Sequence, residues 1–415
     1  MTYDVIIAGA SFAGLAVASR LARARVLLID RKPPGEEPTS ACGTLLGVVQ
    51  RLGLEESLMQ VQDRLAFHLT TRTERFDVSA HPFCTVDYQH FCRGLAKGVT
   101  AEFLQARVQG LEGDGVVTDR GRFQARCLVD ATGWRAQLGR SLRPSLVERE
   151  KMSFGIETVA PRRGETLGFW FDPTQIPQGV AWFFPIGGAA RMGVASYASN
   201  GHLKGHLDIF LEDQGVARSA VHGGFFTARL RPPTVGPVFL VGDAAGQCLP
   251  LTGEGIRPAL FFGQACGAIL QRVLDGELTP AEGRAAYWAV VRRRRPMYWL
   301  LGLLQQILLK APISIGERLV AAVCREPLAS RILRGYVAFA DPAELTPVRG
   351  LDDAPARTGQ AWETASQPAV MEDSHTGEQL ERSPGDSAQG AEGRETMAKD
   401  PVCGMEVDEK HAAAT

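Results

Sequence analysis

The chain has 415 residues, of which 45% are hydrophobic and 22% are charged, a composition typical of a soluble globular protein with two or three domains. Lys and Arg together number 45 against 46 Asp and Glu, so no net field favours a nucleic acid or an acidic partner. The eight cysteines show no paired spacing, which predicts reduced thiols in a cytoplasmic protein. The first residues enter an apolar strand directly, so we expect no signal peptide.

The first thirty residues have the pattern of a βαβ unit that binds a dinucleotide. We expect a strand at Tyr3–Ala8, a helix from Ala13 to about Arg23 and a second strand at Val26–Asp30. The connection "GASFAG" is the fingerprint G-x-G-x-x-G with Ser11 in place of the second glycine. Asp30 ends the second strand where a carboxylate binds an adenosine ribose. The alternative is a plain βαβ turn with a surface Asp. The residues predicted to contact the dinucleotide are Gly9, Ser11, Phe12, Ala13, Gly14, Asp30 and Arg31.

Two further buried strands end in small residues. "RCLVDATG" (126–133) is followed by "WRAQLGR", and "PVFLV" (237–241) is followed by Gly242 and Asp243. A carboxylate at the mouth of a buried strand is costly unless a partner binds it. Residues 65–90 and 150–227 alternate apolar and polar side chains, which predicts a separate antiparallel sheet. From Ala259 onward the pattern is helical, through Ala268–Leu274 and Pro280–Arg295.

These three motifs, in this order, resemble the flavoproteins of the p-hydroxybenzoate-hydroxylase fold over about residues 3–345. The resemblance implies an α/β protein: a Rossmann-like FAD domain with an inserted antiparallel-sheet substrate domain and a helical C-terminus. It also implies that Asp243 accepts hydrogen bonds from the ribityl hydroxyls of FAD. The expected boundaries are 1–65, 90–145 and 228–290 for the FAD domain, 66–89 and 146–227 for the substrate domain, and 291–348 for the C-terminal helices.

Within that fold, the sequence resembles the geranylgeranyl reductase branch. "GDAAGQCLPLTGEGI" is similar to a segment that passes beside the flavin ring, and "WFFP" is similar to the W-x-F-P motif with Trp182 and Phe184. "SACG" resembles the Cys-Gly segment near the flavin and includes Cys42. The flavin contacts that the resemblance implies are Gly133, Arg140, Gly242, Asp243, Pro250, Gly253, Glu254, Gly255 and Ile256.

Four of the candidate side chains also have a purely structural interpretation. Cys42 could supply a proton beside the flavin or could be a small buried hydrophobe. Trp182 and Phe184 could line a tunnel for a polyprenyl chain or could fill the core of the sheet. Arg140 could contact phosphate or flavin, or could be a surface residue. The middle motif has Thr132 and Ala136 where the hydroxylases have Asp and Ser, which disfavours direct reduction by NADPH.

The resemblance predicts an FAD-dependent reductase of carbon–carbon double bonds in an isoprenoid or other apolar substrate. The electron donor would be NAD(P)H or a ferredoxin-like protein. The alternatives are an FAD-dependent monooxygenase or epoxidase, a halogenase, and a non-catalytic flavin-binding or lipid-carrier protein. No His or carboxylate stands out in the sequence as the acid.

The C-terminal third contains three further features. Arg292–Arg295 precede an apolar stretch that is too interrupted to span a membrane; it could lie on an anionic membrane at its inner face or pack as a buried helix with a basic cap. Residues 349–396 are polar and poor in branched aliphatics, which predicts a disordered linker. Residues 397–415 resemble the start of a YHS domain, joined from a neighbouring reading frame. Cys403, Met405 and His411 are soft ligand types, but the segment is too short for that domain, so no metal site is expected.

Overall fold

The computed structural model describes residues 2–38, 40–198, 203–348, 397–399 and 406–408. The chain divides into two units, Met1–Pro355 and Ala356–Thr415. In the second unit, β19 (Met397–Lys399) pairs antiparallel with β20 (Glu406–Asp408). The predicted linker and the three soft ligand residues of the YHS-like segment lie outside the described residues. The other elements described below all belong to the first unit.

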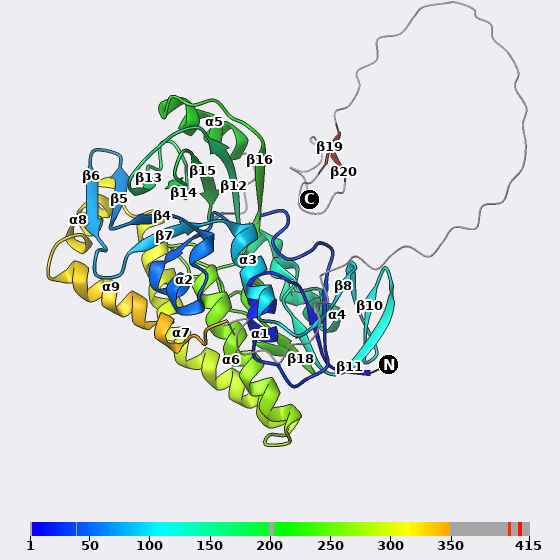
Figure 1. Cartoon of the computed structure of the whole chain (residues 1–415). Helices are drawn as coiled ribbons and strands as arrows, with labels where there is room; N and C mark the ends of the chain where they lie inside the picture. The colour runs from blue at the N-terminus through cyan, green and yellow to red at the C-terminus, as the bar shows by residue number, and fades with distance from the viewer. Residues whose placement is uncertain (1, 39, 199–202, 349–396, 400–405, 409–415) are drawn as a thin grey trace, which may run out of the picture. The chain divides into compact units, whose positions relative to one another are not determined.

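The larger sheet of the first unit has eight strands in the order β17-β18-β11-β1-β2-β8, with β10 and β9 continuing from β11 (Figure 1). Its central pairs are parallel, as expected for a Rossmann-like sheet, whereas the β9-β10-β11 and β17-β18 pairs are antiparallel. Its strands are β1 (Thr2–Ala8), β2 (Val26–Asp30), β8 (Glu102–Gln105), β9 (Val108–Glu112), β10 (Gly115–Thr118), β11 (Gly121–Asp130), β17 (Thr234–Val235) and β18 (Val238–Leu240).

Helices cover this sheet and link its motifs. The shorter ones are α1 (Phe12–Ala18), α2 (Leu46–Leu52), α3 (Tyr88–Lys97) and α4 (Gln137–Leu142). The predicted βαβ start is present, but α1 ends at Ala18 rather than near Arg23. There the hydrogen bonds shorten to an i→i+3 pattern, because Arg20 and Leu21 donate to Val17 and Ala18, and the buried Leu21 fixes this tight turn.

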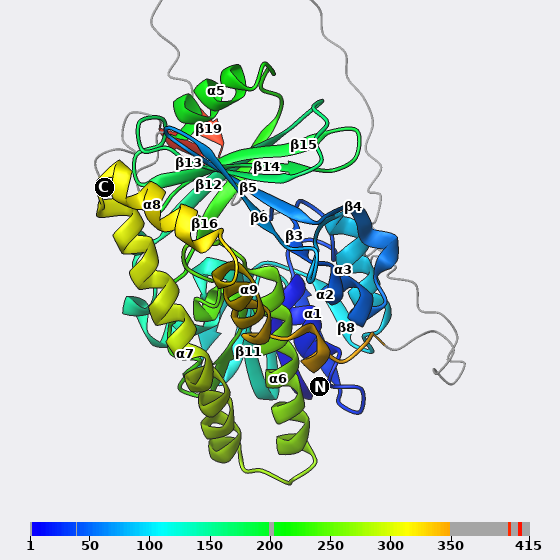
Figure 2. The ribbon, with the colours of Figure 1, turned by 90° about the vertical axis from the view of Figure 1, so that its left-hand side faces the viewer.

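The second sheet has seven strands in the order β16-β12-β15-β14-β13-β5-β6. All its pairs are antiparallel except β13 with β5. The helix α5 (Leu203–Asp213) lies over its outer face, as Figures 1 and 2 show. Its side chains of Leu207 and Phe210 are buried there. The strands are β5 (Arg64–Leu69), β6 (Thr73–Asp77), β12 (Ser153–Ala160), β13 (Leu167–Phe171), β14 (Gly179–Pro185), β15 (Ala190–Ser196) and β16 (Val221–Phe226).

A small third sheet joins the two larger ones, in the order β3 (Gly43–Leu45), β7 (Phe83–Val86) and β4 (Leu58–Gln62). Its strands come from the segments that precede and follow β5 and β6. This sheet therefore places the residues around Cys42 beside the inner face of the seven-stranded sheet.

Four helices complete the first unit: α6 (Ile256–Leu274), α7 (Pro280–Lys310), α8 (Ile313–Val323) and α9 (Leu328–Ala338), seen side by side in Figure 2. The start of α7 is well specified, because Thr279 and Glu282 form a capping box around a proline at the first turn. The helix then continues through Pro296 into residues 291–348, where C-terminal helices were expected, because Tyr298 and Leu301 extend its buried face.

Candidate functional site

The glycine turn after β1 has the geometry that the fingerprint predicts. Gly9 has φ +111°, and a Cβ there would lie 2.1 Å from the carbonyl oxygen of Ala131. A Cβ at Gly14 would lie 1.8 Å from the carbonyl oxygen of Gly9. Only glycine therefore permits this turn and its close contact with α1. The Ser11 hydroxyl does not cap α1 but lies 3.0 Å from the Tyr88 hydroxyl.

Asp30 fixes the same turn from the end of β2. Its carboxylate accepts hydrogen bonds from the backbone N–H of Ala10 (2.7 Å) and of Lys32 (3.3 Å). Burial raises the pKa of this carboxyl, and the backbone donors oppose the shift. The neighbouring Arg31 pairs with Glu37 at 2.9 Å. The carboxylate thus lies beside the turn, as expected for a residue that binds an adenosine ribose.

The middle motif is organised around Asp130, which the sequence did not single out. This fully buried carboxylate accepts hydrogen bonds from the hydroxyl and N–H of Thr132 and from the N–H groups of Leu138 and Gly139, at 2.7–3.0 Å. It therefore holds the first turn of α4 against the end of β11. Gly133, with φ +69°, begins the short 3₁₀ helix η2 (Gly133–Arg135), whereas Arg140 is exposed at the end of α4.

Asp243 lies at the start of the 3₁₀ helix η5 (Gly242–Ala245), directly after β18. No other residue in the described part of the chain donates a hydrogen bond to its side chain. Its carboxyl group is deep enough that burial raises its pKa to about 6, against the opposing charge of Arg231. The Arg231 guanidinium donates to backbone oxygens instead, among them those of Trp134 (2.9 Å) and Asp243 (3.4 Å).

The surroundings of Asp243 fit the hydroxyl-rich part of FAD. A Cβ on the preceding Gly242 would lie 2.9 Å from the Cβ of Ala13, so η5 lies against the first turn of α1. A half-buried carboxylate without a donor is costly, and ribityl hydroxyls are donors of the required kind. The residues present therefore fit this cofactor, with Asp243 beside the glycine turn.

The loop that follows η5 is held by buried polar contacts. The side-chain oxygen of Gln247 accepts a hydrogen bond from the N–H of Gly242 at 2.7 Å. Glu254 forms a buried ion pair with Arg257 at 2.8 Å, so its carboxylate is used within the protein. Leu251 has φ +64°, and Gly253, with the same φ, faces open space. Pro250 and Ile256 are buried, and Gly255 caps the start of α6.

Cys42 has a left-handed backbone conformation, which is uncommon for a residue other than glycine. It has φ +61° and is 1% exposed, and its thiol donates to the Ser40 carbonyl at 3.1 Å. Burial raises the pKa of the thiol to about 12, while the charge of Arg191 opposes the shift. A thiol in this state retains its proton. A Cβ on the adjacent Gly43 would lie 2.9 Å from the ring of Phe184, so the Cys-Gly segment contacts the W-x-F-P motif.

Aromatic rings line the inner face of the seven-stranded sheet. Trp182 and Phe184 point to the same face of β14. The ring of Phe184 lies 5.5 Å from that of Phe169, which in turn stacks on Phe67 at 5.8 Å. All four side chains are half-buried. The sheet thus presents an apolar, partly accessible surface that continues to the Cys-Gly segment.

A charged cluster on the same face holds Trp182 in place. The buried carboxylate of Glu157 accepts hydrogen bonds from the indole N–H of Trp182 (3.2 Å), from Arg191 (3.0 Å) and from His222 (2.8 Å). Gly193 makes room for the indole, because a Cβ there would lie 2.2 Å from the ring. The sequence did not predict the partners of Trp182, since Glu157, Arg191 and His222 lie on three different strands and match no motif.

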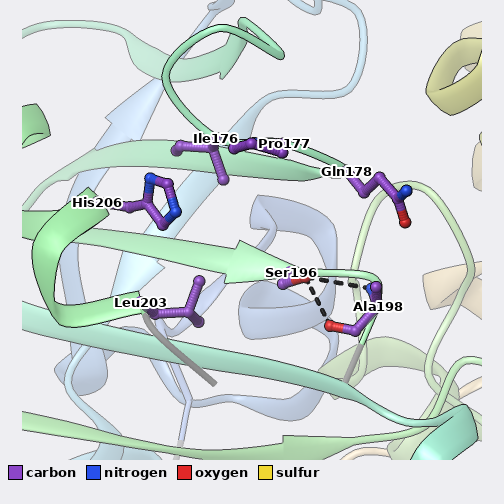
Figure 3. Close-up of a pocket in the computed structure, with 7 residues that line it drawn as sticks. All are labelled: Ile176, Pro177, Gln178, Ser196, Ala198, Leu203 and His206. Carbon is purple, nitrogen blue, oxygen red and sulfur yellow. Dashed lines mark hydrogen bonds between the residues drawn. The ribbon is translucent and has the colours of Figure 1, made fainter. Parts of the chain in front are cut away.

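A separate cavity of about 250 Å³ lies near the start of α5 (Figure 3). Its lining is Ile176, Pro177, Gln178, Ser196, Ala198, Leu203 and His206. None of the residues predicted for the site lines it, and two of its apolar residues, Ile176 and Leu203, belong to the core beneath α5. We therefore place the candidate site on the opposite, inner face of the sheet.

Three other properties concern the described residues as a whole. Their cysteines are all unpaired. No group of three or more His, Cys, Asp or Glu side chains within them is placed to hold a metal ion. Within the same residues, none of the helices combines the length and apolar character needed to span a bilayer.

Comparison with models of known protein families gives no match. The chain is 28% identical over 321 residues to digeranylgeranylglycerophospholipid reductase 1 of Methanopyrus kandleri, an alignment that covers 68% of this chain and 84% of that protein. It is 24% identical over 325 residues to digeranylgeranylglycerophospholipid reductase of Sulfolobus acidocaldarius, covering 67% and 71%.

The fold is similar to solved structures of two kinds. A geranylgeranyl bacteriochlorophyll reductase-like protein from Thermoplasma acidophilum superposes with a TM-score of 0.72 at 18% identity, over 83% of this chain and 97% of that one. A probable FAD-dependent monooxygenase from Pseudomonas aeruginosa superposes with a TM-score of 0.56 at 17% identity, over 81% and 100%. These structural likenesses confirm the expected fold class, and the names of the sequence relatives agree with the resemblance to the reductase branch.

Proposed function

We propose that this FAD-dependent oxidoreductase reduces carbon–carbon double bonds of an isoprenoid lipid. The observation that carries the proposal is a row of half-buried aromatic rings, namely Phe67, Phe169, Phe184 and Trp182. Phe184 in this row contacts Gly43 of the Cys-Gly segment. Hydrocarbon chains are stabilised on such surfaces by burial of apolar area, at about 25 cal/mol per Å². The names of the sequence relatives support the same substrate class.

The residues of the chain would divide the work between them. The Gly9 turn, Asp30 and Asp243 would hold FAD, which supplies a hydride when reduced. Trp182 and Phe184 would orient the alkene and exclude water. Cys42, whose thiol retains its proton, would protonate the second alkene carbon. Glu254 would not contact the cofactor itself but would hold the loop in place, because its carboxylate pairs with Arg257.

The decisive experiment compares reaction with an alkene and reaction with oxygen. Purified protein with photoreduced flavin is mixed anaerobically with a geranylgeranylated glycerophospholipid, and product masses are read. We expect a gain of two hydrogens for each double bond reduced. A substrate that is untouched without air and gains one oxygen with it would replace the reductase with a monooxygenase. Repeating the reduction with NADPH, NADH or reduced ferredoxin in place of light identifies the electron donor.

The C-terminal helices support a contact with a lipid surface, as an oxidoreductase of membrane lipids would need. Several large apolar side chains on these helices are exposed, and we call them the apolar helix face. Its members are Trp299, Leu300, Leu303 and Ile307 on α7, Ile313 and Ile315 on α8, and Leu328 and Ile332 on α9. Trp299 alone is 69% exposed, and an interfacial position is favourable for such a side chain.

Basic residues lie next to this face. Arg292, Arg293 and Arg295 are exposed, whereas Arg294 pairs with Glu344 at 3.0 Å. Each exposed arginine near an anionic membrane contributes about 1 kcal/mol of binding. We therefore propose peripheral attachment to the inner face of a membrane. Salt-sensitive pelleting with anionic vesicles, lost when the three exposed arginines become Gln, tests this; pelleting that is unchanged by the substitutions would refute it.

A further inference from the structure

Two of the three helices that display the apolar helix face, α7 and α9, also hold the predicted flavin loop, residues 247–254. On α7, the side-chain oxygen of Gln305 accepts a hydrogen bond from the N–H of Leu251 at 2.6 Å. One and a half to two turns earlier, the Tyr298 hydroxyl donates to the carbonyl oxygen of Gln247, also at 2.6 Å. Leu251, which Gln305 holds, has the left-handed φ of +64°, a conformation that persists only where the surroundings impose it.

The helix α9 binds the other end of the loop. The Tyr336 hydroxyl is hydrogen-bonded to the carboxylate of Glu254. The fully buried Arg257 pairs with Glu254 and donates to the carbonyl oxygens of Tyr336, Val337 and Ala340 at 3.1–3.2 Å. These carbonyls lie at the C-terminal end of α9, where a cation is favoured. The position of α9 and the position of the loop are therefore linked by a buried charge.

Several exposed side chains of the apolar helix face lie within about one turn of these anchors in the sequence of α7 and α9. Trp299 follows Tyr298 directly, Leu303 and Ile307 flank Gln305, and Ile332 precedes Tyr336 by one turn. A lipid surface that draws the exposed side chains outward would act on the same two helices that hold the loop. Each helix has one side in the protein and one available to the membrane.

We propose that docking of the apolar helix face on an anionic lipid surface is coupled, through Gln305, Tyr298 and Tyr336, to the loop beside the flavin. The coupling rests on the proposed membrane contact and adds that FAD binding and membrane binding influence each other. Thermodynamic linkage requires the effect to be reciprocal: if vesicles change the affinity for FAD by some factor, then FAD changes the affinity for vesicles by the same factor.

The test measures both affinities without any turnover. FAD release from the full chain is followed by flavin fluorescence, with and without vesicles of equal parts phosphatidylcholine and phosphatidylglycerol. Pelleting with the same vesicles is compared for protein with and without FAD. We expect both affinities to change by about fivefold or more, in the range typical of coupled sites.

Four variants separate the coupling from the membrane contact. Gln305→Met should pellet normally but lose the coupling, whereas the exposed neighbour Gln306→Met should behave as the unaltered protein. Replacing Trp299 and Leu303 together by Ser should abolish pelleting and, with it, the effect on FAD. Tyr298→Phe removes only a hydroxyl and provides the same test if Gln305→Met fails to fold.

The outcomes are distinguishable. Normal pelleting with no change in FAD affinity overturns the coupling and leaves the membrane contact standing. Retention of full coupling in both Gln305→Met and Tyr298→Phe overturns the assigned route. Absence of pelleting in the unaltered protein overturns the membrane contact, and with it the coupling; a doubled mass in solution would then assign the face to a second copy of the chain.

Discussion

The indole nitrogen of Trp182 donates a hydrogen bond to the carboxylate of Glu157, 3.2 Å away. The same carboxylate pairs with the buried guanidinium of Arg191, whose Nε has no hydrogen-bond partner among the described residues. The side chain proposed to orient the substrate is therefore fixed by a buried ion pair. Removing one partner of such a pair leaves an uncompensated charge in a poorly solvated place.

Glu157→Leu should therefore destabilise the protein strongly. Breaking a buried pair by removing one partner costs about 3–5 kcal/mol, and here the remaining Arg191 is 8% exposed. Urea unfolding followed by circular dichroism measures the loss. The matched control is the double variant Glu157→Leu with Arg191→Leu, which removes both charges and should recover most of the stability. Equal stability of the single variant and the unaltered protein would show that the Arg191 guanidinium becomes solvated in the variant.

Asp243→Ala should yield a largely colourless protein. The carboxylate is proposed to accept hydrogen bonds from FAD hydroxyls, and hydrogen bonds to a charged group contribute about 1.5–3 kcal/mol each. The absorbance of the flavin relative to that of the protein after purification measures occupancy. Asp243→Asn keeps an acceptor oxygen and should retain an intermediate amount. Full occupancy in the alanine variant would remove Asp243 from the cofactor site and leave the fold unaffected.

The affinity for FAD should rise with pH between about 5 and 7. Burial raises the pKa of Asp243 to about 6, above the unfolded value of about 3.9. In the apoprotein, the raised pKa of this carboxyl therefore adds to the free energy of unfolding. This contribution is fully present below about pH 4 and is lost as the pH rises through about 6. Ionisation of Asp243 strengthens each hydrogen bond that it accepts from an FAD hydroxyl by about 1 kcal/mol. This corresponds to a change of about fivefold in the affinity for FAD.

Fluorescence titration of apoprotein with FAD at several pH values measures this dependence. Asp243→Asn is the control, because its side chain does not ionise in this range. A profile with the same slope in both proteins would assign the pH dependence to another group.

Local patterns in the sequence were sufficient for the parts of the site that depend on the backbone. The glycine turn was predictable because Gly9 and Gly14 occupy positions where any Cβ would clash with a backbone oxygen. The position of Asp243 at the end of a buried strand was also predictable from the apolar run before it, and its contact with FAD stays a prediction. Asp130 carries the same signal, at the end of β11, but its partners lie within its own motif.

The contacts between distant segments could not be predicted in this way. Glu157, Arg191 and His222 meet only because β12, β15 and β16 pair in one register. Arg257 falls within an apolar helical stretch, and its role depends on the carbonyl oxygens of α9 that lie about eighty residues away. The sequence motif also suggested a cofactor role for Glu254, whereas its carboxylate is occupied by Arg257.

Ending the chain after Val348 should leave folding, flavin content and turnover unchanged. The removed sequence is polar and poor in branched aliphatics, so its loss should cost little burial. The last residues kept are well anchored, because Thr346 exchanges hydrogen bonds with Gln264 at 2.7 and 2.9 Å. Thermal unfolding and flavin absorbance of the shortened chain provide the measurement.

The control for this truncation ends two residues before Thr346. That shorter chain loses the contacts of Thr346 with Gln264 and Arg20, and it should unfold at lower temperature. Halved activity after the Val348 truncation, or stoichiometric copper or zinc in the full chain, would assign a role to residues 397–415.

Cys42→Ala should slow reduction of the alkene without loss of bound flavin. The thiol is buried, and its pKa of about 12 keeps it protonated at neutral pH, so it can release a proton only as charge develops on the substrate. A positioned acid typically contributes about 10²–10⁴-fold in rate. Single-turnover mixing of anaerobically reduced protein with the prenylated lipid measures this step separately from reduction of the flavin.

The rates of a serine and an alanine variant distinguish a donor from a packing residue. With Cys42 as the donor, the rate should not titrate with the thiol between about pH 6 and 10, because its pKa of about 12 lies above this window. Cys42→Ser keeps a hydroxyl donor of similar size, so it should be faster than Cys42→Ala if proton donation matters and equally fast if the thiol only fills space. An alanine variant within about twofold of the unaltered rate would assign Cys42, despite its left-handed φ of +61°, to packing against the flavin site.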